Sequence, residues 1–403
     1  MSTPTKVTFP SFMLTISGEL YAPAPGSPNR KNAAIVISHP MTGVKEQTSA
    51  THARALSAAG FWALTFDAGY QGESSGEPRG LEDPHQRVED NKAAVTYLTT
   101  LKGKVDPERI GVLGICASGG YTSYAAQSDS RIKALATVSA ACVGRMTRNG
   151  GVYESNNKES PEAIQGALKA AGEWRNAHAN PDNTKAKSET PKMFSTDLSA
   201  VPKDAPSFFR SAAEYYGGER GQHPRSDQRV PLSSYDLMVS YDSFTYQHFI
   251  APRPLLMIAG SDAETLHYSK DAVATAREPK ELFVVEGKNH FDLYDDLEQS
   301  GPKLVDFFSK RSPTKRSRTA VGTPTAPATP TNHSTAPTTL ATPTRNASTR
   351  AVPPANTPLT TTVPEDVARI CCIPEGHVNA FAAALSDTYE LNNRAGAFID
   401  LVL

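Results

Sequence analysis

Three side chains that could carry out acyl chemistry each follow a short apolar run of this sequence. The pairs are Cys116 after 110–115, Asp262 after 253–260, and His290 after 280–286. In chain order they are a nucleophile, an acid and a base: the acid orients the base, and the base takes the proton of the nucleophile. If the apolar runs are parallel strands, their carboxyl ends meet at one edge of a sheet, where ligands bind. The sequence therefore predicts a catalytic triad of Cys116, Asp262 and His290 that forms an acyl-enzyme.

The residues around Cys116 have the spacing of a sharp turn from strand to helix. Small residues stand two positions before and two after the thiol, Gly114 and Ser118, as a nucleophile elbow requires because its central residue has a strained backbone. A second register, with Ser118 as the nucleophile, also fits this form. Cys116 is favoured because glycine is a better residue than cysteine at the minus-two position. We expect the helix that follows to bias the thiol toward thiolate.

Two backbone amides are predicted to bind the oxyanion of the tetrahedral intermediate. One belongs to Ala117, and the other to Met41 in the loop after an early apolar run. The glycine-rich segment 67–79 is expected to shape the mouth of the pocket, with Tyr70 and Gln71 as lining residues. The cysteines have no metal-ligand spacing and no loop has a phosphate-cradle spacing, so we expect no metal and no cofactor.

Apolar runs alternate with helical patterns up to about residue 143, which predicts an α/β fold: a mostly parallel sheet flanked by helices. Residues 1–143 and 244–310 are expected to form this core, and within it 6–22 to form a hairpin that turns at Gly18. Residues 144–243 are polar with scattered aromatic side chains, as in a helical cap inserted over an active site.

The last part of the chain has a different composition. Residues 311–362 are rich in Thr, Pro and Ala and cannot bury enough apolar surface to offset chain entropy, so we expect a disordered linker. Residues 363–403 have helix-like apolar spacing and predict a small helical extension without a catalytic pattern.

Charge and hydropathy exclude several classes of partner. The 403 residues carry a formal net charge of −1, which gives no electrostatic reason to expect nucleic acid. No apolar run is long enough for a membrane span, and the N-terminus has no signal-peptide pattern. The expected setting is the cytoplasm.

Three motifs carry a resemblance to a known family, and it covers residues 1 to about 310. They are HPMTGVKEQT at 39–48, YQGESSGEPR at 70–79 and GICASGGY at 114–121. They look like the polyketide transferase subgroup of the α/β-hydrolases, which includes a fungal fumagillin-pathway acyltransferase, and the cysteine nucleophile is shared with dienelactone hydrolases. The resemblance implies an α/β-hydrolase fold with a helical cap. It also implies acyl transfer or thioester hydrolysis in secondary metabolism.

The implied partners are small molecules. The acyl donor would be a small molecule such as a polyketide thioester on a synthase carrier domain, and the acceptor a small alcohol or water. Two other functions stay open: a simple carboxylic-ester or lactone hydrolase, and a non-catalytic scaffold in which Cys116 is a redox-sensitive thiol. The presence of Asp262 and His290 argues against the scaffold, which would need neither.

Overall fold

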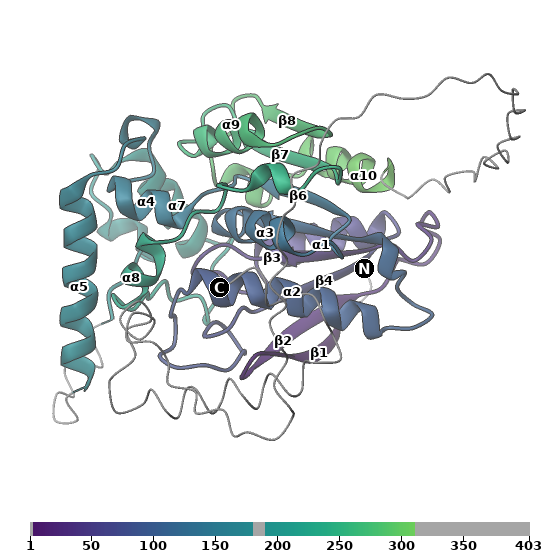
Figure 1. The fold of residues 1–403 in the computed structure, drawn as a ribbon, viewed down its shortest axis with the longest axis horizontal. Coiled ribbons are helices and arrows are strands. Elements are labelled where there is room, and N and C mark those ends of the chain that lie inside the picture. Colours follow the sequence, from purple (N-terminus) through teal and green to yellow (C-terminus); the bar gives the residue numbers. More distant parts are fainter. Residues whose placement is uncertain (1–2, 180–189, 311–403) are drawn as a thin grey trace, which may run out of the picture. The chain divides into compact units, whose positions relative to one another are not determined.

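This computed structural model describes residues 3–179 and 190–310. These residues form an eight-stranded sheet with helices on both faces (Figure 1). The strands are β1 Thr5–Ser11, β2 Leu14–Tyr21, β3 Ala34–Ser38, β4 Trp62–Phe66, β5 Ile110–Ile115, β6 Ala134–Val138, β7 Leu255–Gly260 and β8 Lys280–Val285. The α-helices are α1 Thr48–Ala58, α2 Pro84–Thr100, α3 Ala117–Ser128, α4 Val143–Asn149, α5 Pro161–Ala179, α7 Ser207–Gly217, α8 Ser234–Val239, α9 Leu266–Thr275 and α10 Ser300–Lys310. The expected linker 311–362 and extension 363–403 lie outside the described residues.

The strand order is β1-β2-β4-β3-β5-β6-β7-β8. β2 runs antiparallel to both β1 and β4, and every other neighbouring pair is parallel. Parallel neighbours need crossover connections, and the helices between the strands supply them. This topology confirms the predicted α/β-hydrolase fold.

Both faces of the central strands are buried, which explains why the sequence has continuous apolar runs there. In β3, Ala34 and Val36 pack on one face with side chains of α2, α3 and α9. Ile35 and Ile37 point to the opposite face and pack with α1 and α10. The alternation follows from the two-residue period of a strand.

The expected turn at Gly18 is wrong. The hairpin turns between Ser11 and Leu14, and Gly18 lies inside β2, where it pairs with Val7 on one side and Phe66 on the other. A Cβ atom at Gly18 would lie 2.9 Å from the backbone oxygen of Thr65. This glycine therefore allows β2 and β4 to approach closely and does not form a turn.

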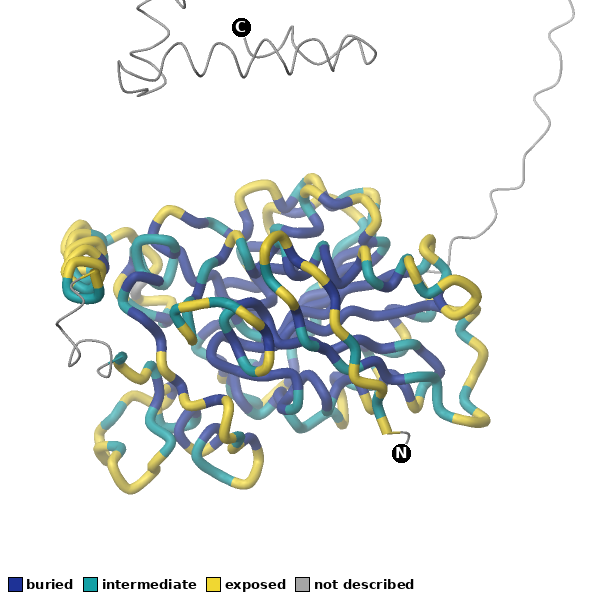
Figure 2. Tube along the Cα trace, turned by 90° about the horizontal axis from the view of Figure 1, so that it is seen from below, coloured by how far each residue is buried: buried dark blue, intermediate teal, exposed yellow. Residues whose placement is uncertain are grey.

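Between β6 and β7 the chain leaves the sheet and forms α4, α5, α7 and α8. Helix α5 stands at one side of the molecule and is mostly exposed, with Ala171 as its one fully buried residue among those described (Figure 2). Helix α7 is different, because Phe208, Tyr215 and Tyr216 are buried among aromatic side chains of the core. None of the helices in 3–179 and 190–310 combines the length and apolarity that a membrane crossing requires.

Candidate active site

Cys116 is the single residue between the end of β5 and the start of α3. Its backbone has φ 58° and ψ −124°, a strained conformation for a residue with a side chain. Gly114 makes this turn possible, because a Cβ atom there would lie 2.1 Å from Thr122 Oγ1 and 2.2 Å from the Ser118 carbonyl oxygen. The structure thus places Cys116 at the centre of a nucleophile elbow, as the small residues around it predict.

Ser118, the alternative nucleophile, is the second residue of α3 and lies on its buried side. It is fully buried. Its hydroxyl accepts a hydrogen bond from Ser38 Oγ at 2.9 Å and donates one to the His39 carbonyl at 2.5 Å. A hydroxyl held in this way ties α3 to the loop after β3.

The two predicted oxyanion donors lie beside Cys116. Met41 and Ala117 line the same small cavity as the thiol, and the Ala117 N–H donates a hydrogen bond to the Cys116 sulfur. Among the described residues, no backbone oxygen accepts a hydrogen bond from the Met41 N–H. Both residues therefore lie beside the thiol, and their role as oxyanion donors stays a prediction.

A buried ion pair that the sequence did not reveal holds the loop that carries Met41. Arg87 in α2 donates from Nε to Glu82 Oε1 at 2.8 Å and from Nη2 to the Pro40 carbonyl at 3.2 Å. Its Nη1 also lies 3.2 Å from His39 Nε2. Because both charged side chains are almost fully buried, the geometry of this loop is tied to an interaction that is costly to break.

A second buried cation, Lys45, occupies an acidic cluster in the same region. Among the described residues, Glu46, Asp67 and Glu73 are the acidic groups close enough together to hold a metal ion. The Lys45 ammonium lies 2.8 Å from a carboxylate oxygen of each of them. The cluster is therefore an internal salt-bridge network that anchors the start of α1.

His290 is brought to the site, and its two ring nitrogens have different partners. Nδ1 lies 2.6 Å from the hydroxyl of Thr265, and Nε2 lies 3.1 Å from the hydroxyl of Tyr294. The Tyr294 hydroxyl also interacts with the Cys116 sulfur, and this interaction lowers the pKa of the thiol. The imidazole is fully buried against Phe208 and other aromatic rings.

Asp262, the predicted acid, is not brought to the imidazole. Its side chain is exposed and accepts a hydrogen bond from Ser261 Oγ at 2.8 Å. The Asp262 amide donates to the Lys288 carbonyl, and this contact holds the loop so that the carboxylate faces outward. The chain then turns, and Thr265 is the residue that reaches His290 Nδ1.

Burial also sets the protonation states of the two reactive groups. It raises the pKa of the Cys116 thiol to about 11, and it lowers the pKa of the His290 imidazole to about 3. Hydrogen bonds from Tyr294 and the Ala117 amide act on the thiol in the opposite direction but are outweighed. The expected bias toward thiolate is therefore wrong, and at neutral pH the pair is a neutral thiol and a neutral imidazole.

Cys116 is partly exposed, and its thiol faces a small cavity of about 20 Å³, which has room for about one water molecule. Its walls are almost entirely apolar. They are formed by Met41, Cys116, Ala117, Ala141, Val143, Met146, Met193, Phe194, Phe208, Tyr216, Phe291 and Tyr294. Phe194, Phe208 and Tyr216 come from the segment between β6 and β7, so that segment supplies the cover over the thiol.

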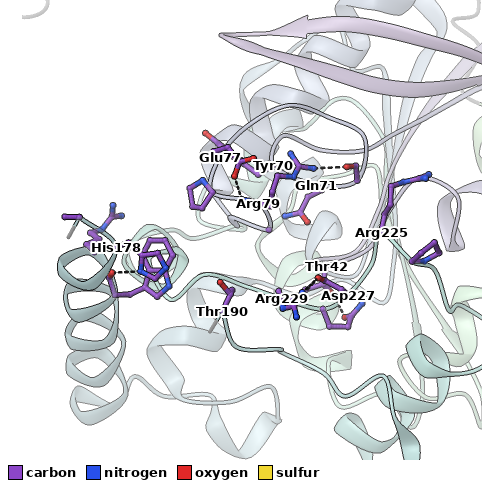
Figure 3. Close-up of a pocket in the computed structure, with 18 residues that line it drawn as sticks. Thr42, Tyr70, Gln71, Glu77, Arg79, His178, Thr190, Arg225, Asp227 and Arg229 are labelled. Atoms are coloured by element: carbon purple, nitrogen blue, oxygen red, sulfur yellow. Dashed lines mark hydrogen bonds and ion pairs between the residues drawn. The ribbon is translucent and has the colours of Figure 1, made fainter. Parts of the chain in front are cut away.

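Tyr70 and Gln71 lie elsewhere, along an open groove of about 1120 Å³ (Figure 3). Thr42 also lines this groove, and its hydroxyl is bonded to Gln228 on the groove side and to Tyr216 on the cavity side. Thr42 therefore stands between the groove and the cavity that the thiol faces.

Thr265 and Tyr294 are the residues that sequence reasoning missed. Tyr294 stands four positions after His290, at the end of a 3-10 helix spanning Asp292–Tyr294, and this spacing is its one local signal. Thr265 stands three positions after the predicted acid, and a threonine before a helix usually indicates only a cap.

Comparisons with known proteins show which family the chain resembles. A family model described as the dienelactone hydrolase family matches residues 19–140. The uncharacterised protein YcjY of Escherichia coli strain K12 is 39% identical over 290 residues, 70% of this chain and 89% of YcjY. The crystal structure of the hypothetical protein PA2218 from Pseudomonas aeruginosa has a TM-score of 0.68 and 33% identity, and the match covers 77% of this chain and 94% of that one. The acyltransferase drtE of Aspergillus calidoustus is 25% identical over 306 residues, 74% of this chain and 91% of drtE.

The family match and the acyltransferase relative favour an enzyme over the scaffold alternative. The protein is an enzyme of the hydrolase or acyltransferase type, and ester hydrolysis or acyl transfer is its general chemistry. The chain belongs to the dienelactone hydrolase family of α/β-hydrolases.

Proposed function

We propose that this enzyme transfers acyl groups through a thioester on Cys116. The observation that carries the proposal is the strained backbone of Cys116, which presents its thiol to an apolar cavity beside the amides of Met41 and Ala117. An elbow of this kind has a conformational cost that a purely structural cysteine would not need.

The proposed chemistry balances with the groups present. The Cys116 sulfur attacks the acyl carbonyl while the thiol proton passes to His290, and the two amides bind the resulting oxyanion. Collapse of the tetrahedral intermediate breaks the bond to the leaving group, which takes the proton from the imidazolium. A second attack by an alcohol or water on the thioester releases an ester or an acid. Asp262 takes no part in this proposal.

The proposed donor is a polyketide thioester on a synthase carrier domain, and the proposed acceptor is a small alcohol. The motif resemblance supports a place in secondary metabolism, and the similarity to the acyltransferase drtE supports acyl transfer. The apolar and aromatic walls of the cavity support transfer over hydrolysis, because a water molecule competes poorly in an apolar site. We also propose a cytoplasmic location, which suits the free thiols of Cys116 and Cys142.

A second candidate function is the hydrolysis of a carboxylic ester or a lactone. The match to the dienelactone hydrolase family favours it. The same thioester would form, and the two candidates differ in the acceptor alone.

Intact mass measurement after incubation with a panel of acyl esters and thioesters tests the proposal. We expect an acyl adduct on the parent protein and on Ser118→Ala, and no adduct on Cys116→Ala. An adduct that persists on Cys116→Ala would contradict the proposal. Adding a small alcohol to the acylated protein then separates the candidates, since transfer yields an ester and hydrolysis yields an acid.

Slow alkylation of Cys116 by iodoacetamide is not a test of this function. Because burial raises the pKa of the thiol to about 11, little thiolate is present at neutral pH even in a working enzyme.

A further inference from the structure

Tyr294 stands between the two groups that must exchange a proton. Its side chain is fully buried, and its hydroxyl contacts Cys116, His290 and Tyr216. Tyr294 lines the same cavity as the Cys116 thiol, and its hydroxyl interacts with the sulfur and lowers the pKa of the thiol. The imidazole likewise has its Nε2 hydrogen-bonded to Tyr294, at 3.1 Å.

These contacts form one continuous chain of hydrogen-bonding groups. It runs from the Cys116 thiol through the Tyr294 hydroxyl to Nε2 of His290, and from Nδ1 to the Thr265 hydroxyl at 2.6 Å. When Nδ1 carries the hydrogen and donates it to Thr265, Nε2 is free to accept from Tyr294. The Tyr294 hydroxyl that lowers the pKa of the thiol donates toward the sulfur; when its single O–H turns to Nε2 instead, its oxygen is left to accept from the thiol.

We propose that Tyr294 is a catalytic residue that relays the proton of Cys116 to His290. The inference rests on the proposed function and adds a residue to its mechanism. In the relay the S–H bond breaks as the Tyr294 oxygen takes that proton, and the phenolic O–H bond breaks as Nε2 takes the other. The net change is one proton moved from sulfur to imidazole, and Tyr294 is neutral before and after.

The groups around Cys116 and His290 favour a proton relay over a thiolate–imidazolium pair that exists before the substrate binds. The residue at Nδ1 is a neutral hydroxyl, so no fixed negative charge stabilises an imidazolium before the substrate arrives. After the transfer, the Tyr294 O–H points at the sulfur and can stabilise the thiolate by a hydrogen bond. The cavity of about 20 Å³ leaves little space for a water chain that could replace the hydroxyl.

Tyr294→Phe tests the relay, because it removes the hydroxyl and keeps the buried ring. With p-nitrophenyl butyrate as the acyl donor, kcat/KM reports acylation, and the leaving group departs as an anion without needing a proton. We expect kcat/KM to fall about 100-fold, within the range usual for lost acid-base catalysis. Tyr215→Phe is the matched control: Tyr215 is buried, its ring packs on Tyr294 at 4.9 Å between centroids, and its hydroxyl contacts Thr48. It should leave kcat/KM within about twofold of the parent value.

A second measurement separates a relay from a structural role. The dependence of the parent rate on the deuterium fraction of the solvent should be curved, because two protons move in one step. A straight line for the parent, or a kcat/KM for Tyr294→Phe equal to that of the parent, would overturn the relay and leave the proposed function standing. A parent protein that forms no adduct with any donor would overturn both. If Tyr294→Phe fails to fold by circular dichroism, the solvent experiment on the parent decides alone.

Discussion

Cys116 lies between two buried polar networks of opposite character. On the side of the oxyanion loop, Glu82 and Arg87 form a full ion pair that also contacts the Pro40 carbonyl and the His39 ring. On the side of the histidine, the hydrogen-bond partners among the described residues are the hydroxyls of Thr265 and Tyr294, and neither is charged. The charged network holds backbone in place, and the neutral one contacts the groups that react.

The difference shows that, in an apolar site, one set of residues can hold the backbone in position while another set takes part in proton transfer. A buried ion pair is expensive to disturb, so it fixes the loop that carries the Met41 amide. A neutral thiol and a neutral imidazole avoid charge separation in the cavity until a substrate is present. The charge then develops during the reaction, where the two amides can stabilise it.

Removing a charge from the first network should have the largest effect. Arg87→Met leaves the buried Glu82 carboxylate without its charged partner and with the Tyr121 hydroxyl as a neutral donor, and we expect a loss of about 3–5 kcal/mol in the free energy of unfolding, measured by urea denaturation. The matched control is Arg175→Met, which breaks the partly exposed pair with Asp236 and should cost less than about 1 kcal/mol. Equal losses in the two variants would contradict the distinction drawn here.

Breaking the neutral network at its far end should have a moderate effect. Thr265→Val removes the hydrogen-bond partner of His290 Nδ1, and we expect kcat/KM for an acyl ester to fall about tenfold, with stability changed by about 1 kcal/mol. Thr275→Val, at an exposed position near the end of α9, provides a control that should not alter kcat/KM. An unchanged rate in Thr265→Val would show that the imidazole does not depend on this hydroxyl.

Changing pH should have the smallest effect on acylation. His290 can accept a proton only while neutral, and since burial lowers its pKa to about 3, it stays neutral far below the usual histidine range. The thiol stays protonated until pH approaches its raised pKa of about 11. We therefore expect kcat/KM to vary less than about twofold between about pH 5 and pH 9. A fall below about pH 6.5 would instead show that His290 titrates as an exposed histidine does.

Much of the fold follows from local patterns in the sequence. The central strands were predictable because both of their faces are buried, so each reads as an unbroken apolar run. The position of Cys116 was predictable because the elbow depends on residues within two positions of it, above all Gly114. Gly18 shows what local patterns cannot predict. A glycine is needed there because the backbone of Thr65, on a strand more than forty residues away in the sequence, lies too close for a side chain.

The sequence by itself determined the parallel sheet, the elbow and the loop that carries Met41, because these depend on periodicity and on steric limits within a few residues. The tertiary structure alone decided that Thr265 and not Asp262 faces His290, and that Tyr294 stands between the imidazole and the thiol. It also decided that both reactive groups are neutral, because burial by aromatic side chains from distant segments sets their pKa values. Such burial depends on how segments far apart in the chain pack together, and no local pattern contains it.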